Sequence, residues 1–445
     1  MRDEAIAGRK AGQRLAHPQG RQRAFEAAQV EGFFRHFALV ESGPSIHDIG
    51  RVGQPRGTGS ESGISQLHKV VVDGEAKEPI QRIARLTPLD AVLARIDALV
   101  QPVAAREVAL AGAVGRVLAG DVVVAARPRV SLALRDGWAV DSALTRDASP
   151  YAPAALPSAI SVEAGSPLPA GADAVAEIDA VMLRDGRAEA VAAITSGEGV
   201  LSAGAEADGA AALCHDGRRL HAAAGAALAA AGVTGVRIRE PRVLVVRGKP
   251  VGDPIIDAAA ALVAHGITAA GGVVLGDSCD VRPDAALQRP DVDAVIAIGG
   301  TGNGRTDTSV ATLARLGCVE AHGIAISPGE TAAFGCVQAR PVLLLPGRLD
   351  GALAAWLLLG ERMLARLAGS REETPAVTAR LTRKVASNLG LAELIPVRLH
   401  DGQAEPLGSG YLPLRTIAQA DGWILVPPDR EGHPEGASVM VRLWP

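Results

Sequence analysis

Aromatic residues and cysteines are scarce in this sequence of 445 residues, and each shortage excludes a class of protein. Phenylalanine, tryptophan and tyrosine together make up 2% of the chain. No two of the four cysteines form a CxxC pair, which argues against a zinc ribbon and against a disulfide framework. The cysteine usage therefore favours a reducing, cytoplasmic setting.

Long hydrophobic runs and an excess of one charge are also missing. The stretch GALAAWLLLG near Leu357 is among the longest apolar runs, and it falls short of the roughly 20 residues that span a bilayer. The net charge is −4, with acidic and basic residues interspersed, so there is no general attraction to nucleic acid or to an anionic membrane. We expect small-molecule ligands, no nucleic acid and no membrane.

The length predicts several domains, because single cores stop growing at roughly 250–300 residues. Residues 1–85 hold three of the five lysines and a turn-rich stretch, RVGQPRGTGSESGISQ, without an apolar repeat. They are expected to be mostly disordered. One hypothesis places the natural start near residues 70–72 and treats the upstream residues as a wrongly extended reading frame. Order begins at LTPLDAVLARIDALV, where Thr87 suits a cap and Pro88 the first helical position.

The rest of the chain predicts a multidomain α/β protein. Residues 86–117 and 197–240 are expected to form a helical linking domain, and residues 118–196 form short β-like runs that predict a β-rich lobe. Strand and helix patterns alternate over residues 241–372, which predicts a doubly wound α/β domain. Residues 373–445 return to short β-like runs, which favour a small C-terminal β-barrel.

The α/β region contains a glycine-rich loop between an apolar stretch and a segment with helical spacing, AVIAIGGTGNGRTDTSVATL at residues 294–313. Ligands of open α/β sheets bind at the carboxyl ends of the strands, where this loop would lie. Glycines allow positive φ, so successive N–H groups can converge on an anion at the start of the following helix. Two interpretations stay open, a phosphate-binding loop and an ordinary tight turn.

Several short motifs in a fixed order resemble those of the molybdopterin molybdenumtransferase family, the MoeA and gephyrin E-domain family. They are LRDGWAV, GSPLPAGADAV, IID before a helix, GGTGNGRTD, SPGE, LLPG, and GSGYL followed by IAQADGWILVP. The resemblance covers about residues 86–445. It implies a reaction in which adenylylated molybdopterin and molybdate give molybdenum cofactor and AMP, assisted by Mg²⁺ or another divalent cation.

The resemblance also implies roles for particular residues. Cleavage of a phosphoanhydride needs backbone donors or cations to stabilise the leaving phosphate. The catalytic candidates are Asp136, Asp257 and Asp307, and Asp257 is also the candidate metal ligand. Capping of the next helix is the alternative for Asp307, and a turn or helix-start role is the alternative for the other two. The candidates for binding the pterin nucleotide are Gly299, Gly300, Thr301, Gly302, Gly304, Pro328, Gly329, Pro346, Gly347 and Arg348.

Charged positions of the family are altered here, whereas its glycines and prolines largely persist. Ser131 stands where the family usually has Asp, and Ala164 where it has Thr. The family's Gly-Asp-Glu turn is Gly-Lys-Pro at residues 248–250, and its Lys-Pro-Gly-Lys-Pro element is Ser-Pro-Gly-Glu-Thr at residues 327–331. This pattern is typical of a retained fold with altered chemistry. Arg348, in place of the Asn in Pro-Gly-Asn-Pro, is the best candidate for relocated positive charge, because a guanidinium binds phosphate in bidentate fashion.

Two functions follow from the resemblance. The first is insertion of molybdate into adenylylated molybdopterin with release of AMP. The alternative is a catalytically impaired paralogue that binds molybdopterin or the finished cofactor as a carrier, sensor or partner protein. A relationship to nicotinamide-nucleotide amidases is disfavoured, because they lack the LRDGWAV and PLPAGADAV segments.

The resemblance also bears on partners. It implies a homodimer in which the lobe that carries Asp136 faces Asp307 of the partner subunit. Molybdoenzymes or other cofactor-biosynthesis proteins are the expected further partners.

Overall fold

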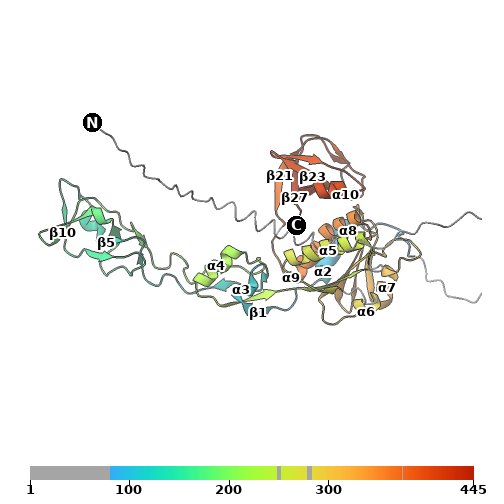
Figure 1. Cartoon of the computed structure of the whole chain (residues 1–445), viewed down its shortest axis with the longest axis horizontal. Coiled ribbons are helices and arrows are strands. Elements are labelled where there is room, and N and C mark those ends of the chain that lie inside the picture. Colours follow the sequence, from blue (N-terminus) through green and yellow to red (C-terminus); the bar gives the residue numbers. More distant parts are fainter. Residues whose placement is uncertain (1–80, 248–251, 278–282, 373, 445) are drawn as a thin grey trace, which may run out of the picture. The chain divides into compact units, whose positions relative to one another are not determined.

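The computed structural model describes residues 81–247, 252–277, 283–372 and 374–444 (Figure 1). The hypothesis of a start near residues 70–72 lies outside these residues, and the expectation of disorder over residues 1–85 lies largely outside them. No helix among the described residues is long and apolar enough to cross a membrane.

The first described helix, α2 (Leu89–Leu99), belongs to the core of the α/β domain, where it buries Val92 and Ile96. The expected cap at Thr87 is not found, because the N-cap is Pro88 and no side chain bonds to the helix start. Thr87 instead pairs through its backbone with residues 323–325 of the α/β domain. Thr87 therefore contributes to pairing within the α/β domain and not to the helix cap that the local sequence pattern predicts.

Two short helices and two small sheets follow α2. Strands from the two ends of this region pair in the order β1-β13-β2, and a second pair joins β12 to β3. The alanine-rich helix begins where His221 accepts a hydrogen bond from Ala224 N–H, and Gly232, with φ of +84°, follows its end. The elements are β1 (Arg106–Ala109), α3 (Leu110–Ala113), β2 (Val117–Leu118), β3 (Val122–Val123), β12 (Ala212–Cys214), α4 (Ala222–Ala230) and β13 (Gly235–Arg239).

The β-rich lobe consists of small antiparallel sheets, in the orders β6-β10-β9, β7-β5-β8 and β11-β4. The motif LRDGWAV forms the link from β4 into β5. Gly137, the first residue of β5, leaves no room for a side chain, because a Cβ there would lie 2.0 Å from Ala176 O. The strands are β4 (Leu132–Ala133), β5 (Gly137–Val140), β6 (Ala154–Leu156), β7 (Ile160–Val162), β8 (Ala174–Ala176), β9 (Val181–Arg184), β10 (Arg187–Ala190) and β11 (Val200–Leu201).

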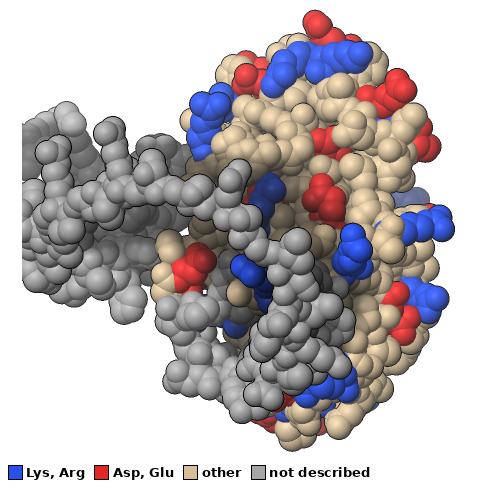
Figure 2. All heavy atoms as spheres, turned by 90° about the vertical axis from the view of Figure 1, so that its right-hand side faces the viewer, with Lys and Arg blue, Asp and Glu red and all other residues tan. Residues whose placement is uncertain are grey.

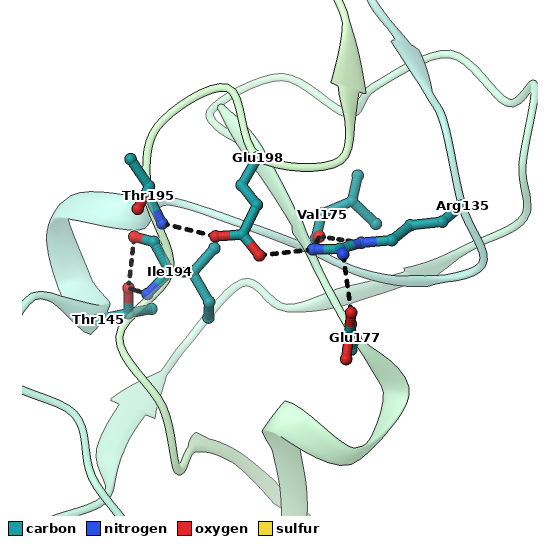
Figure 3. A network of polar contacts seen from close by, with 7 residues as sticks. All are labelled: Arg135, Thr145, Val175, Glu177, Ile194, Thr195 and Glu198. Atoms are coloured by element: carbon teal, nitrogen blue, oxygen red, sulfur yellow. Dashed lines mark hydrogen bonds and ion pairs between the residues drawn. The ribbon is translucent and has the colours of Figure 1, made fainter.

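A polar network centred on Arg135 joins separate segments of this lobe (Figure 3). The Arg135 guanidinium donates to Val175 O at 2.8 and 3.0 Å and pairs with Glu177 at 3.0 Å and Glu198 at 2.8 Å. Its hydrogen bond lowers the pKa of Glu198. Glu198 also accepts from Thr195 N–H at 3.1 Å. The arginine of LRDGWAV therefore has a structural role, which leaves Asp136 as the residue of this motif to consider for function.

The α/β domain has a six-stranded sheet in the order β15-β14-β16-β20-β19-β17, whose first four strands are parallel. Successive strand residues alternate between two hydrophobic clusters, as the two-residue period of a strand requires. One cluster packs against α5, α8 and α9 and the other against α6 and α7, on opposite sides of the sheet (Figure 1). The expected doubly wound architecture is confirmed.

The elements of this domain largely follow the sequence pattern. Asp253 caps α5 by accepting from the N–H groups of Ile255 and Ile256, so the helix starts earlier than expected and places Asp257 in its first turn. A π-helical turn separates α8 from α9. The elements are β14 (Arg242–Arg247), α5 (Pro254–Ala269), β15 (Val273–Asp277), α6 (Pro283–Leu287), β16 (Ala294–Ile298), α7 (Ser309–Leu316), β17 (Cys318–His322), β18 (Ile326–Ser327), β19 (Ala333–Val337), β20 (Arg340–Leu345), α8 (Leu349–Ala355) and α9 (Glu361–Ala368).

The C-terminal residues form a closed five-stranded β-barrel, as expected. The ring of pairings runs β23-β24-β21-β27-β25 and closes between β25 and β23. Strand β18 of the preceding domain pairs in parallel with β23, and Leu394, Leu412 and Trp423 join the core of the α/β domain. The barrel is thereby attached to the domain that carries the glycine-rich loop. The elements are β21 (Ala376–Leu381), β23 (Ala392–His400), β24 (Gln403–Pro406), α10 (Leu414–Gln419), β25 (Gly422–Val426) and β27 (Ser438–Leu443).

Glu361, the first residue of α9, is expected to make stability depend on pH. Burial raises the pKa of its carboxyl from 4.5 to about 7. The native state therefore binds more protons than the unfolded chain between these pH values, so stability falls as the pH rises through this window. We expect the wild type to lose about 3 kcal/mol between pH 4.5 and 8 relative to Glu361→Gln. Denaturant unfolding at both pH values measures this, with exposed Glu107→Gln as control, and equal pH slopes for wild type and Glu361→Gln would contradict it.

Candidate functional site

Three segments predicted to bind a pterin nucleotide lie together beside the carboxyl ends of β16 and β20 of the α/β sheet. A Cβ placed on Gly347, after β20, would lie 3.4 Å from Gly299 Cα, after β16. A Cβ placed on Gly351 would lie 3.5 Å from Gly329 Cα and 3.1 Å from Pro346 Cβ. The segments that contain Gly299, Pro328 and Pro346 therefore approach each other closely enough to contact one ligand.

The glycine loop, defined here as residues 299–304, is held by hydrogen bonds. Gly299 and Gly300 have φ of +94° and +72°, the left-handed region that glycine tolerates best. Ser309 of α7 donates from its hydroxyl to Gly299 O at 2.8 Å and from its N–H to Gly300 O at 3.1 Å. The loop is thereby fixed to the start of the helix that follows it.

Thr301 lies at the buried centre of the glycine loop, with 1% of its surface exposed. Its hydroxyl shares a hydrogen bond of 3.0 Å with the Thr331 hydroxyl, and His322 Nε2 donates to Thr301 O at 3.1 Å. Thr331 belongs to the altered segment 327–331, so this segment contacts the glycine loop in spite of its lost lysines. The conformation of the loop is supported from β17 and from the segment after β18.

Asp307 closes the outer turn of the glycine loop. Its Oδ2 accepts from Gly304 N–H at 2.9 Å, and its own N–H donates to Gly304 O at 3.0 Å. The residue before α7 is Thr308, which provides no side-chain cap. Asp307 is therefore not the helix cap considered as its alternative role, and its carboxylate lies within the loop.

The first turn of α7 is capped by a residue that the sequence pattern did not reveal. The buried side chain of Gln81 accepts from the N–H groups of Val310 and Ala311, each at 3.1 Å. More than 200 residues separate Gln81 from α7, as their numbering shows. A lone glutamine in a segment without periodicity carries no local signal for such a contact.

Asp257 forms an ion pair with Arg247 at the end of β14, with 2.9 Å between Oδ1 and Nε. The Asp257 side chain is 38% exposed and that of Arg247 is 15% exposed. Among the described residues, no group of three or more His, Cys, Asp and Glu side chains could hold a metal ion. Asp257 is therefore paired with an arginine and, in the part of the chain that the structure describes, is not grouped with further side chains that could bind a divalent cation.

Arg348 and Asp350 form a bidentate pair at the start of α8. Arg348 donates from Nε to Asp350 Oδ1 at 3.0 Å and from Nη2 to Oδ2 at 2.5 Å, and these hydrogen bonds raise the pKa of Arg348. Arg348 also stacks on the Tyr411 ring of the barrel, 5.0 Å from its centroid. Its side chain is nevertheless 63% exposed, so the guanidinium can meet solvent or a ligand while its charge is compensated.

Asp136 lies in the link between β4 and β5, where its Oδ1 accepts from Ala164 N–H at 2.8 Å. Ala164 is one of the positions at which the resemblance implies a substitution. Among the described residues, no hydrogen bond joins Asp136 to the glycine loop, so within one chain it is not brought to the other candidates.

On the face shown in Figure 2, positive and negative side chains are interspersed.

Three family models match the chain in consecutive regions. The MoeA N-terminal region (domain I and II) matches residues 87–232, and the probable molybdopterin binding domain matches residues 255–366. The MoeA C-terminal region (domain IV) matches residues 378–444. The glycine loop and the segments that contain Pro328 and Pro346 fall within the probable molybdopterin binding domain, and Asp136 falls within the MoeA N-terminal region.

The solved structures and the curated protein that resemble this chain are named as molybdopterin biosynthesis proteins. A crystal structure of the molybdopterin biosynthesis MoeA protein from Pyrococcus horikoshii is 26% identical, with a TM-score of 0.66, covering 81% of this chain and all of that one. A second structure of that name is 22% identical with a TM-score of 0.68 and the same coverage, which shows the fold alone. A provisionally named molybdopterin biosynthesis protein of Methanocaldococcus jannaschii is 30% identical over 154 residues, 34% of this chain. That match spans about a third of the curated relative, 36% of its length.

Proposed function

Since the chain belongs to the MoeA-like family of molybdenum cofactor biosynthesis, we propose that it binds adenylylated molybdopterin and molybdate and inserts the metal with release of AMP. Members of this family are generally molybdopterin molybdenumtransferases. Because charged positions of the family are substituted in this chain, catalytic turnover of the two substrates is the property to be tested.

The observation that carries the proposal is the set of backbone donors in the glycine loop. The N–H of Gly299 donates to Leu345 O at 2.9 Å and is therefore not a free donor. The N–H groups of Gly300, Thr301 and Gly302 make no hydrogen bond with any described residue. Backbone donors without a partner, at the carboxyl end of β16 and beside Gly347, suit the oxygens of a phosphate.

In the reaction, an oxygen of molybdate or water bonds to phosphorus as the phosphoanhydride bond between the AMP group and the molybdopterin phosphate breaks, and negative charge develops on the leaving phosphate. Donors that are already held in position stabilise such charge without reorganisation during the step. Ser309 and Thr331 hold the loop by hydrogen bonds. The exposed guanidinium of Arg348 lies on the next strand-end loop, where it would add positive charge.

The second candidate function is binding without turnover, by a carrier, sensor or partner protein. The observation that favours it is that the charged candidates of the α/β domain are all engaged by protein groups. Asp257 pairs with Arg247, Asp307 accepts from the glycine loop, and Arg348 pairs with Asp350. Each of these side chains would have to share or exchange its protein partner in order to bind a substrate.

The two functions are separated by incubating the purified full chain with adenylylated molybdopterin, with and without molybdate, and measuring AMP by chromatography. AMP release that needs molybdate supports insertion. Saturable binding of the pterin nucleotide without AMP release supports the binding protein. Absence of binding would overturn both.

Mg²⁺ or another divalent cation stays a prediction from the family alone. Addition of a chelator before the substrates is expected to stop AMP release. Activity that survives the chelator would agree with the lack of a fitting ligand set among the described residues.

We also expect a homodimer in which the lobe that carries Asp136 completes the site of the other subunit. Light scattering at micromolar concentration should give twice the 45.4 kDa of one chain. If Asp136→Ala and Gly300→Val are each inactive, mixing them should restore about a quarter of the activity, because only mixed dimers contain one intact site. A monomeric mass would remove the basis for a shared site.

Partners among molybdoenzymes or cofactor-biosynthesis proteins and a cytoplasmic location stay predictions.

A further inference from the structure

Gln81 lies upstream of the regions that the family models match, yet its side chain is inside the candidate site. The first matched region begins at residue 87. Gln81 is 9% exposed, and its polar contacts are with the glycine loop and α7, 219 or more residues further along the chain. No role follows for this residue from the MoeA-like regions themselves.

The carboxamide of Gln81 is fully used. Its oxygen accepts from Val310 N–H and Ala311 N–H, each at 3.1 Å. Its nitrogen donates to Gly300 O at 2.8 Å and to Gly302 O at 2.9 Å. Two acceptor sites and two donors are the complete hydrogen-bonding capacity of a primary amide, so the surroundings match this group in number and type.

The contacts compensate for two weaknesses in the local sequence. Helix α7 lacks a side-chain cap at Thr308, which would leave N–H groups of its first turn without partners. The glycine loop has few side chains with which to hold itself, and glycine loses much conformational freedom on folding. Gln81 accepts hydrogen bonds from two N–H groups in the first turn of α7 and donates to two carbonyl groups of the glycine loop.

The same geometry argues against a phosphate at this position. The amide nitrogen lies between the carbonyl oxygens of Gly300 and Gly302, which would repel an anion that replaced it. The expectation that the loop donors converge with the start of α7 on one anion is therefore incorrect for α7, because an amide already occupies that place. The unpartnered N–H groups of residues 300–302 are the donors that stay available.

We propose that Gln81 is a positioning residue, which caps α7 and holds residues 300–302 in the conformation that leaves their N–H groups free for the phosphate of the ligand. The proposal rests on the proposed function, because it assigns a phosphate to these donors. Gln81 itself does not touch the ligand. It acts through the backbone that it holds.

The test compares full-length wild type with Gln81→Met and Gln81→Glu. Methionine has a similar length without hydrogen bonds, so amide exchange at Val310 and Ala311 should accelerate, and the Kd for AMP, measured by calorimetry, should rise about tenfold. Ionised glutamate keeps the acceptors but sets a negative charge against two carbonyl groups. The affinity of Gln81→Glu for AMP, expressed relative to wild type at the same pH, should recover at low pH, because protonation of the glutamate restores one hydrogen-bond donor. Methionine should show no such recovery.

Two controls separate positioning from general loss of stability. Gln101→Met makes the same change at an exposed residue near the end of α2, and Ile96→Val weakens the core that α2 shares with the α/β domain. Both should leave AMP affinity unchanged. Normal exchange and normal affinity in Gln81→Met would overturn the proposal, and tighter binding would show instead that Gln81 blocks the site. If wild type binds neither AMP nor pterin nucleotide, the proposed function fails, and the exchange of Val310 and Ala311 still tests the capping.

Discussion

Gly300→Val is expected to weaken the binding of AMP and of adenylylated molybdopterin by roughly 100-fold, or about 3 kcal/mol. Gly300 has φ of +72°, which is strained for a β-branched residue, and a Cβ there would lie 2.5 Å from Ser309 Oγ. Relief of this overlap must displace the backbone of the glycine loop and the N–H groups proposed to meet the phosphate. Calorimetric titration with AMP measures the effect without requiring turnover.

Gly390→Val is the matched control for backbone strain. Gly390 has φ of +86°, and nothing lies within 4 Å of the position that its Cβ would take. This variant should lose stability by a similar strain while binding AMP as the wild type does. Wild-type affinity in folded Gly300→Val would show that the glycine loop is only a turn between β16 and α7.

Asp350→Ala is expected to lower the free energy of unfolding by about 3 kcal/mol. Asp350 is 3% exposed and accepts from Gly351 N–H at 2.8 Å and Leu412 N–H at 3.2 Å, in addition to Arg348. Its removal leaves the N–H of Leu412, a residue that is itself 2% exposed, without that partner. The loss also removes a link between α8 and the barrel. Denaturant unfolding of the full chain measures it, and a change below about 1 kcal/mol would contradict the assigned role.

Arg348→Ala separates the structural from the ligand-binding role of the same pair. Because the Arg348 side chain is 63% exposed and Asp350 keeps two backbone donors, the stability loss should be smaller, about 1 kcal/mol. If the guanidinium also binds phosphate, affinity for the pterin nucleotide should fall by about 1.5–3 kcal/mol, most strongly at low salt. Unchanged affinity would leave Arg348 as a purely structural partner of Asp350.

The glycine loop could be predicted from the sequence because its signal is local. Residues 294–298 form an apolar run of strand length, the glycines follow it directly, and Val310 and Leu313 repeat at helical spacing. The order of such units determines on which edge of a parallel sheet each loop lies. The position of residues 299–304 at the carboxyl end of β16 therefore required no knowledge of tertiary contacts.

The partners of the charged candidates could not be predicted in this way. The expected position of Asp257 at a helix start is found in the first turn of α5, but its ion pair with Arg247 has no signal in the sequence. Asp307 was expected to bind ligand or to cap α7, and it accepts from Gly304 instead. A side chain pairs with whichever complementary group the fold brings within hydrogen-bond distance, and one-dimensional spacing does not contain that information.

By itself, the sequence determined the family, the doubly wound domain, the C-terminal barrel and the place of the glycine loop, since these follow from periodicity, turn residues and the order of short motifs. Only the tertiary structure decided that Gln81 caps α7, and that Asp350 ties the start of α8 to Leu412 of the barrel. The physical reason is that backbone pattern is set by neighbours along the chain, whereas buried polar groups must find partners wherever the folded chain places them.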